Sequence, residues 1–285
     1  MSAIMRKISN VTLLKIVNKV KRKMNIYIRN GWLFRPVYKV FWKEKKLNLG
    51  DRNNNFGYWG WETVDIRDAD YIVNFHNAII PLPDESCSAV YSCGMIEHIS
   101  DESSLTLFSE VCRVLKTGSR FRVVYPDLDR MIKLYKEGDH DHFLYHIISC
   151  QQWVIDEIKS GKIPKESFYL HNNVARVLAS YIDTGEGPII EKEIFDKKIN
   201  ELDNLEFAKW CVSLLDKNRI DMNSNVGHIN AFNFSKIKSM LEKVGFTEVV
   251  EYNANEYGDE IFTESCFGAN EKIKEWAAEY VEAKK

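Results

Sequence analysis

The sequence predicts an α/β fold built on a mostly parallel sheet. Between residues 46 and 129, short apolar runs that fit buried strands alternate with a longer segment of helical period. This alternation is typical of parallel sheets covered by helices. The runs also end at glycines or polar residues. Because ligands of such sheets lie beyond the carboxyl ends of the strands, we expect these residues to line one crevice.

The predicted strands follow one another closely in the first half of the chain. They are KLNLGDRNNN (46–55), WETVDI (61–66), ADYIVNF (69–75), the start of SAVYSCGMIEHIS (88–100) and RFRVVYPDLD (120–129), with a helix over 101–118 before the last. The residues that end these strands are Gly50, Asp65, Asn74, Ser92 and Asp127. The sequence therefore predicts a ligand site at these five positions.

Composition indicates a globular chain with one catalytic domain and additions, since 285 residues can bury a substantial core. The six cysteines are scattered and form no CxxC pair, which favours reduced thiols in a cytosol over disulfides or a zinc site. No run of 18 apolar residues is present, and the N-terminus lacks the pattern of a secretory signal. We therefore expect a cytoplasmic protein.

The charge is distributed unevenly along the chain. Residues 1–46 carry a net charge of +12, whereas residues 47–285 carry −14. Residues 10–24 fit an amphipathic helix with lysines around an apolar stripe. This basic N-terminal arm, residues 1–45, either contacts an anionic membrane surface or packs on the body with its lysines solvated. No RNA-binding signature is present and the body is acidic, so we expect no nucleic-acid partner.

Three segments together resemble the class I S-adenosylmethionine-dependent methyltransferases. They are LNLGDRNNNFGYWGWETVDI, IPLPDESCSAVYSCGMIEHIS and EVCRVLKTGSRFRVVYPDL. The likeness is to the compact group associated with surface-polysaccharide biosynthesis, and it resumes in FNFSKIKSMLEKVGFTEVVEY (232–252). It implies a Rossmann-like sheet, S-adenosylmethionine as cofactor, and a terminal EYVEAKK that forms an antiparallel closing strand.

The resemblance places the cofactor at the ends of the first two strands. Gly50 allows close backbone approach, but Asp51 and Arg52 stand where the family has a small residue and another glycine. Arg52 either pairs with the methionine carboxylate of the cofactor or blocks the pocket. Asp65 is the candidate for the ribose hydroxyls, a role that acids play after the second strand of dinucleotide-binding folds. Its alternative role is to cap a turn.

The remaining cofactor candidates follow the next two strands. Asn74 stands where the family often has an aspartate facing the adenine amino group, and an amide oxygen can accept the same bond. Asn77 is the fallback if the alignment slips. The resemblance implies that Ser92, Cys93 and Gly94 form the floor of the cofactor site.

Three residues are candidates for the catalytic base on the acceptor side. His98 belongs to a Glu-His pair that is expected to begin a helix, and its alternative role is structural. Asp127 either faces the acceptor or caps the following helix. His228 precedes the last helix, where the family frequently has a histidine.

Residues 139–225 do not match the core pattern and are expected to form a helical insertion that serves as the acceptor lid. The motif HDHFLYH within it suggests a metal site, but no matching carboxylate cluster is evident. We therefore expect no metal. Residues 46–285 form the predicted methyltransferase domain that contains this insertion.

The predicted function is methyl transfer from S-adenosylmethionine to an acceptor, implied by the resemblance to be a hydroxyl of a sugar or of a small or lipid-linked glycan precursor. Two alternatives stay open. The altered glycine turn fits a degenerate methyltransferase fold that binds or scaffolds without activity. A sugar-modifying enzyme with another donor would also fit. The sequence predicts neither the acceptor nor the oligomeric state.

Overall fold

A computed structural model describes residues 45–51, 61–139, 160–161, 171–172, 174–175, 189–214, 228–263 and 278–285. The predicted basic helix, Arg52 and the HDHFLYH motif lie outside the described residues. In the described part of the chain, no helix has the length and apolar content needed to cross a membrane.

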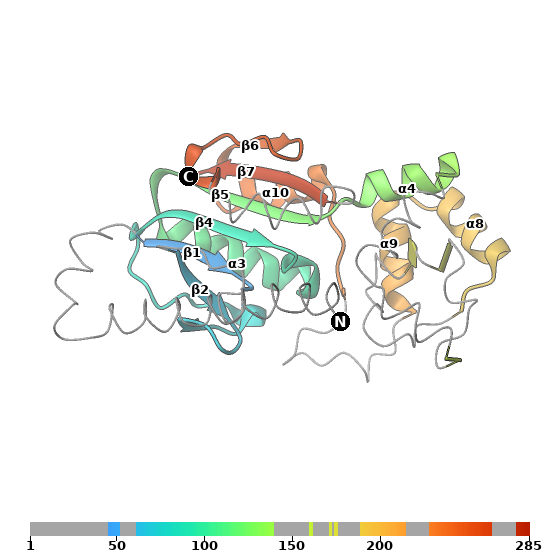
Figure 1. Cartoon of the computed structure of the whole chain (residues 1–285), viewed down its shortest axis with the longest axis horizontal. Coiled ribbons are helices and arrows are strands. Elements are labelled where there is room, and N and C mark those ends of the chain that lie inside the picture. The colour runs from blue at the N-terminus through green and yellow to red at the C-terminus, as the bar shows by residue number, and fades with distance from the viewer. Residues whose placement is uncertain are drawn as a thin grey trace, which may run out of the picture.

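One seven-stranded sheet organises the described residues, with the order β3-β2-β1-β4-β5-β7-β6 (Figure 1). The strands are β1 (Lys45–Leu49), β2 (Trp61–Asp65), β3 (Tyr71–Ile72), β4 (Cys87–Cys93), β5 (Leu115–Pro126), β6 (Thr247–Tyr252) and β7 (Ala278–Lys284). The first five pair in parallel, whereas β7 is antiparallel to both β5 and β6. The predicted fold class and the closing strand are confirmed.

The two faces of the sheet bury different apolar clusters. On β4, Val90 belongs to a core that includes Phe108 of α3 (Asp101–Val114) and Leu241 of α10 (Phe234–Lys243). Its neighbour Tyr91 belongs to a second cluster on the opposite face, with Phe262. Successive side chains of a strand point to opposite faces, and burial on both is what a central parallel strand requires.

A third apolar cluster lies beyond the carboxyl end of β5. Three helices build it, α4 (Leu128–Glu137), α8 (Lys192–Glu201) and α9 (Asn204–Ser213), and Figure 1 shows them as a separate group beside the sheet. Its centre includes Phe195 and Phe207, whose rings meet edge-on at 5.2 Å. Two of these helices, α8 and α9, fall inside the insertion predicted from the sequence. The helical group therefore stands at the edge of the sheet where ligands of this fold class bind.

Candidate active site

The turn after β1 is closely packed against Met95, two residues beyond the end of β4. Gly50 has a φ of +80°, and its N–H donates to the Val64 carbonyl at 2.8 Å. A Cβ there would lie 2.8 Å from the Met95 side chain. The buried Asp51 accepts a hydrogen bond from Asn48 Nδ2 at 3.0 Å. The glycine is therefore required by backbone conformation and by protein packing, besides any approach to a ligand.

The side chains of Asp65 and Asn74 both accept hydrogen bonds from backbone N–H groups close to them in the sequence. Asp65 Oδ1 accepts from the Ile66 N–H at 2.6 Å, and the residue is buried at the end of β2. Asn74 Oδ1 accepts from the His76 N–H at 3.0 Å and caps the short 3-10 helix η2 (Phe75–Asn77). One carboxylate oxygen of Asp65 is thus hydrogen-bonded to the adjacent backbone, and both roles predicted for this residue stay predictions. An oxygen atom has a second lone pair, so neither contact removes the residue from the ligand site.

The end of β4 lies directly beside the end of β1. Leu49 is paired with Ser92 across the two strands, so Gly50 and Cys93 continue side by side. Ser92 is fully buried, and its Oγ has no hydrogen-bond partner among the described residues. Gly94 has a φ of +67°, and its N–H donates to Val124 of β5 at 2.9 Å. The sheet register therefore gathers the predicted floor residues and the glycine turn at one edge.

Two of the predicted catalytic residues, His98 and His228, contact each other beside the buried Glu97. His98 and His228 stack edge-to-face with ring centroids 4.9 Å apart. Glu97 Oε1 lies 3.8 Å from His228 Nε2. One potential ligand atom from each of these three residues lies within 4.8 Å of those of the other two. We call Glu97, His98 and His228 the Glu-His-His cluster.

The backbone holds this cluster together across a long sequence separation. The Glu97 carbonyl accepts from the N–H groups of Ile229 and Asn230 at 3.0 and 3.1 Å. Asn230 Nδ2 also donates to Asp101 Oδ1 at 2.8 Å. Glu97 and His98 form a 3-10 turn, η3 (Ile96–His98), and α3 begins only at Asp101, so the expectation that they begin the helix is wrong. Ser100 caps α3 and thereby fixes the later start.

Asp127 caps α4. Its Oδ1 accepts from the Arg130 N–H at 2.9 Å, and its backbone bridges to Phe232 ahead of α10. Burial raises the pKa of this carboxyl, against the hydrogen bond and the charge from Arg130. Capping, one of the two roles predicted for Asp127, is therefore observed, and its predicted role as base stays untested.

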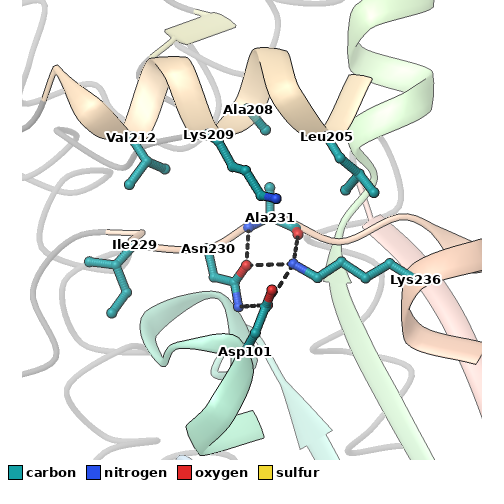
Figure 2. Close-up of a pocket in the computed structure, with 9 residues that line it drawn as sticks. All are labelled: Asp101, Leu205, Ala208, Lys209, Val212, Ile229, Asn230, Ala231 and Lys236. Carbon is teal, nitrogen blue, oxygen red and sulfur yellow. Dashed lines mark hydrogen bonds and ion pairs between the residues drawn. The ribbon is translucent and has the colours of Figure 1, made fainter. Parts of the chain in front are cut away.

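A cavity of about 320 Å³ opens between α9 and the segment that follows His228 and leads into α10 (Figure 2). Leu205, Ala208 and Val212 of α9 form an apolar wall. Lys236 lines the opposite side and donates to Asp101 Oδ1 at 2.7 Å, to Asn230 Oδ1 at 2.7 Å and to the Ala231 carbonyl at 2.9 Å. The sequence did not predict this cavity, because its wall comes from the insertion and its floor from two distant segments.

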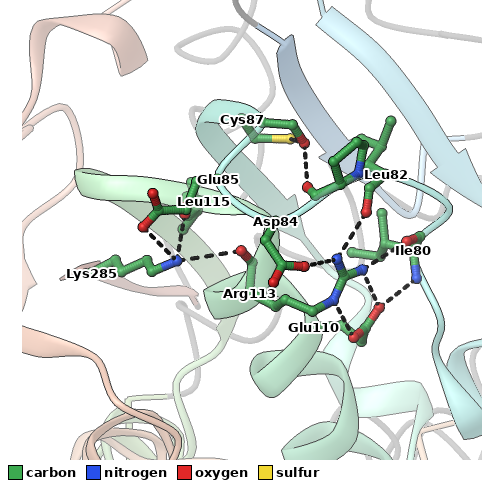
Figure 3. Close-up of polar contacts among 11 residues, drawn as sticks. Ile80, Leu82, Asp84, Glu85, Cys87, Glu110, Arg113, Leu115 and Lys285 are labelled. Atoms are coloured by element: carbon green, nitrogen blue, oxygen red, sulfur yellow. Dashed lines mark hydrogen bonds and ion pairs between the residues drawn. The ribbon is translucent and has the colours of Figure 1, made fainter.

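A second polar cluster has a structural role (Figure 3). Arg113 donates to the carbonyls of Ile80 and Leu82 at 2.9 and 2.8 Å, and to Asp84 at 2.7 Å. Glu110 accepts from the Ile80 N–H at 2.8 Å and pairs with Arg113. These contacts bind the proline-containing turn before β4 to the end of α3, so they position β4 and its carboxyl-end residues.

Part of the chain is similar to a known protein family. Residues 55–123 match the family model described as "Methyltransferase domain". This segment runs from before β2 into β5 and contains Asp65, Asn74, Ser92 and the Glu97-His98 pair. No curated protein matches the chain.

Solved structures similar to this chain include methyltransferases of low sequence identity. An S-adenosylmethionine-dependent methyltransferase from Archaeoglobus fulgidus is 14% identical with a TM-score of 0.36, covering 93% of this chain and 94% of that one. Another from Mesorhizobium loti is 15% identical with a TM-score of 0.37, covering 85% and 90%. Phosphoethanolamine N-methyltransferase 2 from Haemonchus contortus, in complex with S-adenosyl-L-methionine, is 12% identical with a TM-score of 0.36, covering 90% and 53%.

The assignment of the fold depends on the sheet itself. Its strand order, its parallel pairing from β1 to β5 and its antiparallel β7 are those that the sequence resemblance implies. Residues 55–123 therefore match a methyltransferase-domain model, and the sheet that contains them has the Rossmann-like fold that the sequence predicts.

Proposed function

We propose that this protein transfers a methyl group from S-adenosylmethionine to a hydroxyl of a sugar or glycan precursor. The observation that carries the proposal is the family match over residues 55–123, on a sheet whose carboxyl edge gathers Gly50, Asp65 and Ser92. The sugar acceptor comes from the resemblance of the sequence to polysaccharide-biosynthesis methyltransferases.

The edge residues suit the parts of such a cofactor. Asp65 would accept from the ribose hydroxyls, and Asn74 would face the adenine ring. The buried Ser92 Oγ, which has no partner among the described residues, is a polar atom that a ligand would satisfy. Asp51 and Asn48 lie next to Gly50 and would surround the methionine part together with Arg52.

The reaction mainly requires that the acceptor hydroxyl be aligned with the methyl group and that this hydroxyl lose its proton. The acceptor oxygen bonds to the methyl carbon as the carbon–sulfur bond breaks, which leaves a neutral thioether. Alignment of the two reactants can lower the barrier by about 7–11 kcal/mol. The hydroxyl proton must also leave during attack. The Glu-His-His cluster supplies proton-accepting groups, and His228 directly precedes Ile229, which lines the cavity; both observations support an acceptor site on this side.

Calorimetric titration with S-adenosylhomocysteine tests the cofactor assignment. We expect wild type to bind, and Asp65→Ala to lose about 1–3 kcal/mol of affinity because the ribose hydroxyls lose their acceptor. Glu102→Ala, which removes an exposed carboxylate from α3, is the matched control and should bind like wild type. No heat from folded wild type would favour a degenerate scaffold or an enzyme with another donor. Unchanged affinity of Asp65→Ala would leave binding intact and refute the ribose assignment.

A further inference from the structure

The Glu97 side chain is a buried carboxylate that the protein leaves incompletely satisfied. The residue is 4% exposed, and its Oε2 has no hydrogen-bond partner among the described residues. A buried carboxylate is costly unless a cation or several donors compensate it. The side chains that face it in the cluster are those of His98 and His228. Neither imidazole carries a negative charge, and imidazole is the commonest metal ligand in proteins.

The distances in the cluster fit a shared cation better than a direct bond between side chains. Glu97 Oε1 and His228 Nε2 are 3.8 Å apart, beyond hydrogen-bonding distance. Zinc holds histidine nitrogen and carboxylate oxygen at about 2.0–2.2 Å, so two tetrahedral ligands lie roughly 3.3–3.5 Å from each other. All three potential ligand atoms lie within 4.8 Å of one another. Small side-chain rotations would therefore bring them onto one ion.

The frame around the cluster is already built. Two backbone N–H groups, from Ile229 and Asn230, donate to the Glu97 carbonyl and hold the segment after His228 against η3. Asn230 donates to the Ile99 carbonyl at 3.0 Å and so fastens the same segment a second time. Ligands from two distant parts of the chain are thus held in place by contacts that do not involve the imidazole rings.

We propose that Glu97, His98 and His228 bind one divalent transition-metal ion, with Zn²⁺ as the best-suited ion. Two histidines and one glutamate are a ligand set of catalytic zinc sites, in which a fourth position stays open for water or substrate. Imidazole ligands favour transition metals, whereas Mg²⁺ and Ca²⁺ prefer oxygen ligands only. The sequence did not suggest this set, because the third ligand lies far along the chain and the more visible histidine motif lies elsewhere.

The role of the ion rests on the proposed function, although its binding does not. The cavity of about 320 Å³ is lined by Ile229 and Asn230, whose N–H groups donate to the Glu97 carbonyl, so an acceptor that extends from the cavity past Ile229 toward His228 would reach the open position. A metal-bound hydroxyl has a lowered pKa and releases its proton to water more readily. The ion would thus activate the acceptor oxygen, and neither imidazole would need to take the proton.

Zinc titration of the metal-stripped, untagged full-length protein tests the site. We expect one tightly bound equivalent in wild type, and a loss of more than about 100-fold in Glu97→Gln, His98→Ala and His228→Ala, since loss of an outer-shell partner alone costs roughly 10–100-fold. The control removes two histidines of the other motif, in His140→Ala/His142→Ala. This control should keep the equivalent, and Mg²⁺ should produce no comparable heat. Loss of zinc in the control with retention in the three cluster variants would overturn the proposal.

A second measurement does not depend on the folding of variants. Co²⁺ added to wild type should give visible absorption bands of a site with nitrogen and oxygen ligands, and Zn²⁺ should displace them. Absence of such bands would reject the metal site and leave the proposed function standing. Methyl transfer that survives complete chelation would reject the role of the ion in activating the acceptor. Tight zinc binding without any affinity for S-adenosylhomocysteine would support the metal site and reject the proposed function.

Discussion

Arg122 and Glu282 form a salt bridge in the interior of the sheet. The Arg122 Nη1 and Glu282 Oε1 atoms are 2.8 Å apart, and both side chains are fully buried. The two residues are register partners on the antiparallel strands β5 and β7. The Gly258 N–H donates to the same carboxylate oxygen at 3.0 Å, and the Arg122 guanidinium lies 4.5 Å from the centre of the Tyr257 ring. Burial raises the pKa of the Glu282 carboxyl, against the opposing charge of Arg122.

Removing one partner of this pair should be far more destabilising than removing both. We expect Arg122→Met to lower the free energy of unfolding by about 3–5 kcal/mol, because it leaves a buried charge uncompensated. The double variant Arg122→Met/Glu282→Leu should recover much of this loss. Urea unfolding followed by circular dichroism measures both. A single variant as stable as wild type would contradict the ion-pair account of how β5 and β7 are joined.

Glu279, the second residue of β7, lies in a group of acids at the carboxyl end of β5. Burial raises the pKa of its carboxyl to about 8, and the charges of Asp127 and Glu251 act in the same direction. The residue is 6% exposed. In the unfolded chain the same carboxyl titrates near its usual pKa of about 4.3. Folded protein therefore keeps this proton over a pH range in which the unfolded chain has lost it.

This difference predicts a loss of stability as the pH rises. Below about pH 4 the proton is bound in both states, and between that point and about pH 8 each unit lowers the free energy of unfolding by up to roughly 1.4 kcal/mol. Above about pH 8 the loss is complete. Glu279→Gln should match wild type near pH 4 and exceed it at pH 9. If the free energies of unfolding of the two proteins differ by the same amount at every pH in this range, Glu279 is not the titrating group.

Gly50→Ala should destabilise the fold and weaken cofactor binding together. A φ of +80° is unfavourable for alanine, and the added Cβ would lie 2.8 Å from Met95. We expect a loss of about 1–3 kcal/mol in the free energy of unfolding. Gly138→Ala, whose φ is also positive but whose Cβ would meet nothing within 4 Å, isolates the backbone contribution. Equal losses of unfolding free energy in the two variants would show that the contact with Met95 does not contribute to the destabilisation.

The sheet could be predicted because each of its strands is marked locally. Apolar runs such as WETVDI end at polar or glycine residues, and the predicted carboxyl-end residues Gly50, Asp65 and Ser92 do lie at one edge. The antiparallel β7 was harder to predict, because EYVEAKK has a composition that suits a helix equally well. Its place in the sheet is fixed by long-range pairing with β5, which no local pattern encodes.

The acceptor side could be predicted only in part. His98 and His228 were both candidates, but their contact with each other and with Glu97 depends on how the segment before α10 folds back onto η3. The cavity was not predicted, because its polar floor pairs Asp101 with Lys236 across 135 positions of the sequence. Local periodicity carries no information on such pairings. The register of the sheet and the helix caps determine them.

The sequence predicts two alternative roles for Asp127, helix cap and catalytic base. A pair of substitutions at this position separates the two roles. Asparagine caps helices about as well as aspartate but cannot take a proton, whereas alanine can do neither. Since Asp127 Oδ1 already accepts from the Arg130 N–H, we expect the cap to be its main role. Asp127→Asn should then keep both stability and methyl transfer within a few-fold of wild type.

Asp127→Ala should lose about 0.5–2 kcal/mol of stability through the missing cap, with turnover falling only as far as α4 is displaced. Turnover is best measured well below the unfolding temperature, so that the loss of stability does not reduce the amount of folded enzyme. His228→Ala gives the comparison, because loss of a group that activates the acceptor should cost about 10²–10⁴-fold. If Asp127→Asn instead loses activity to that extent while remaining as stable as wild type, the proton leaves through Asp127. The Glu-His-His cluster would then hold or orient the acceptor without activating it.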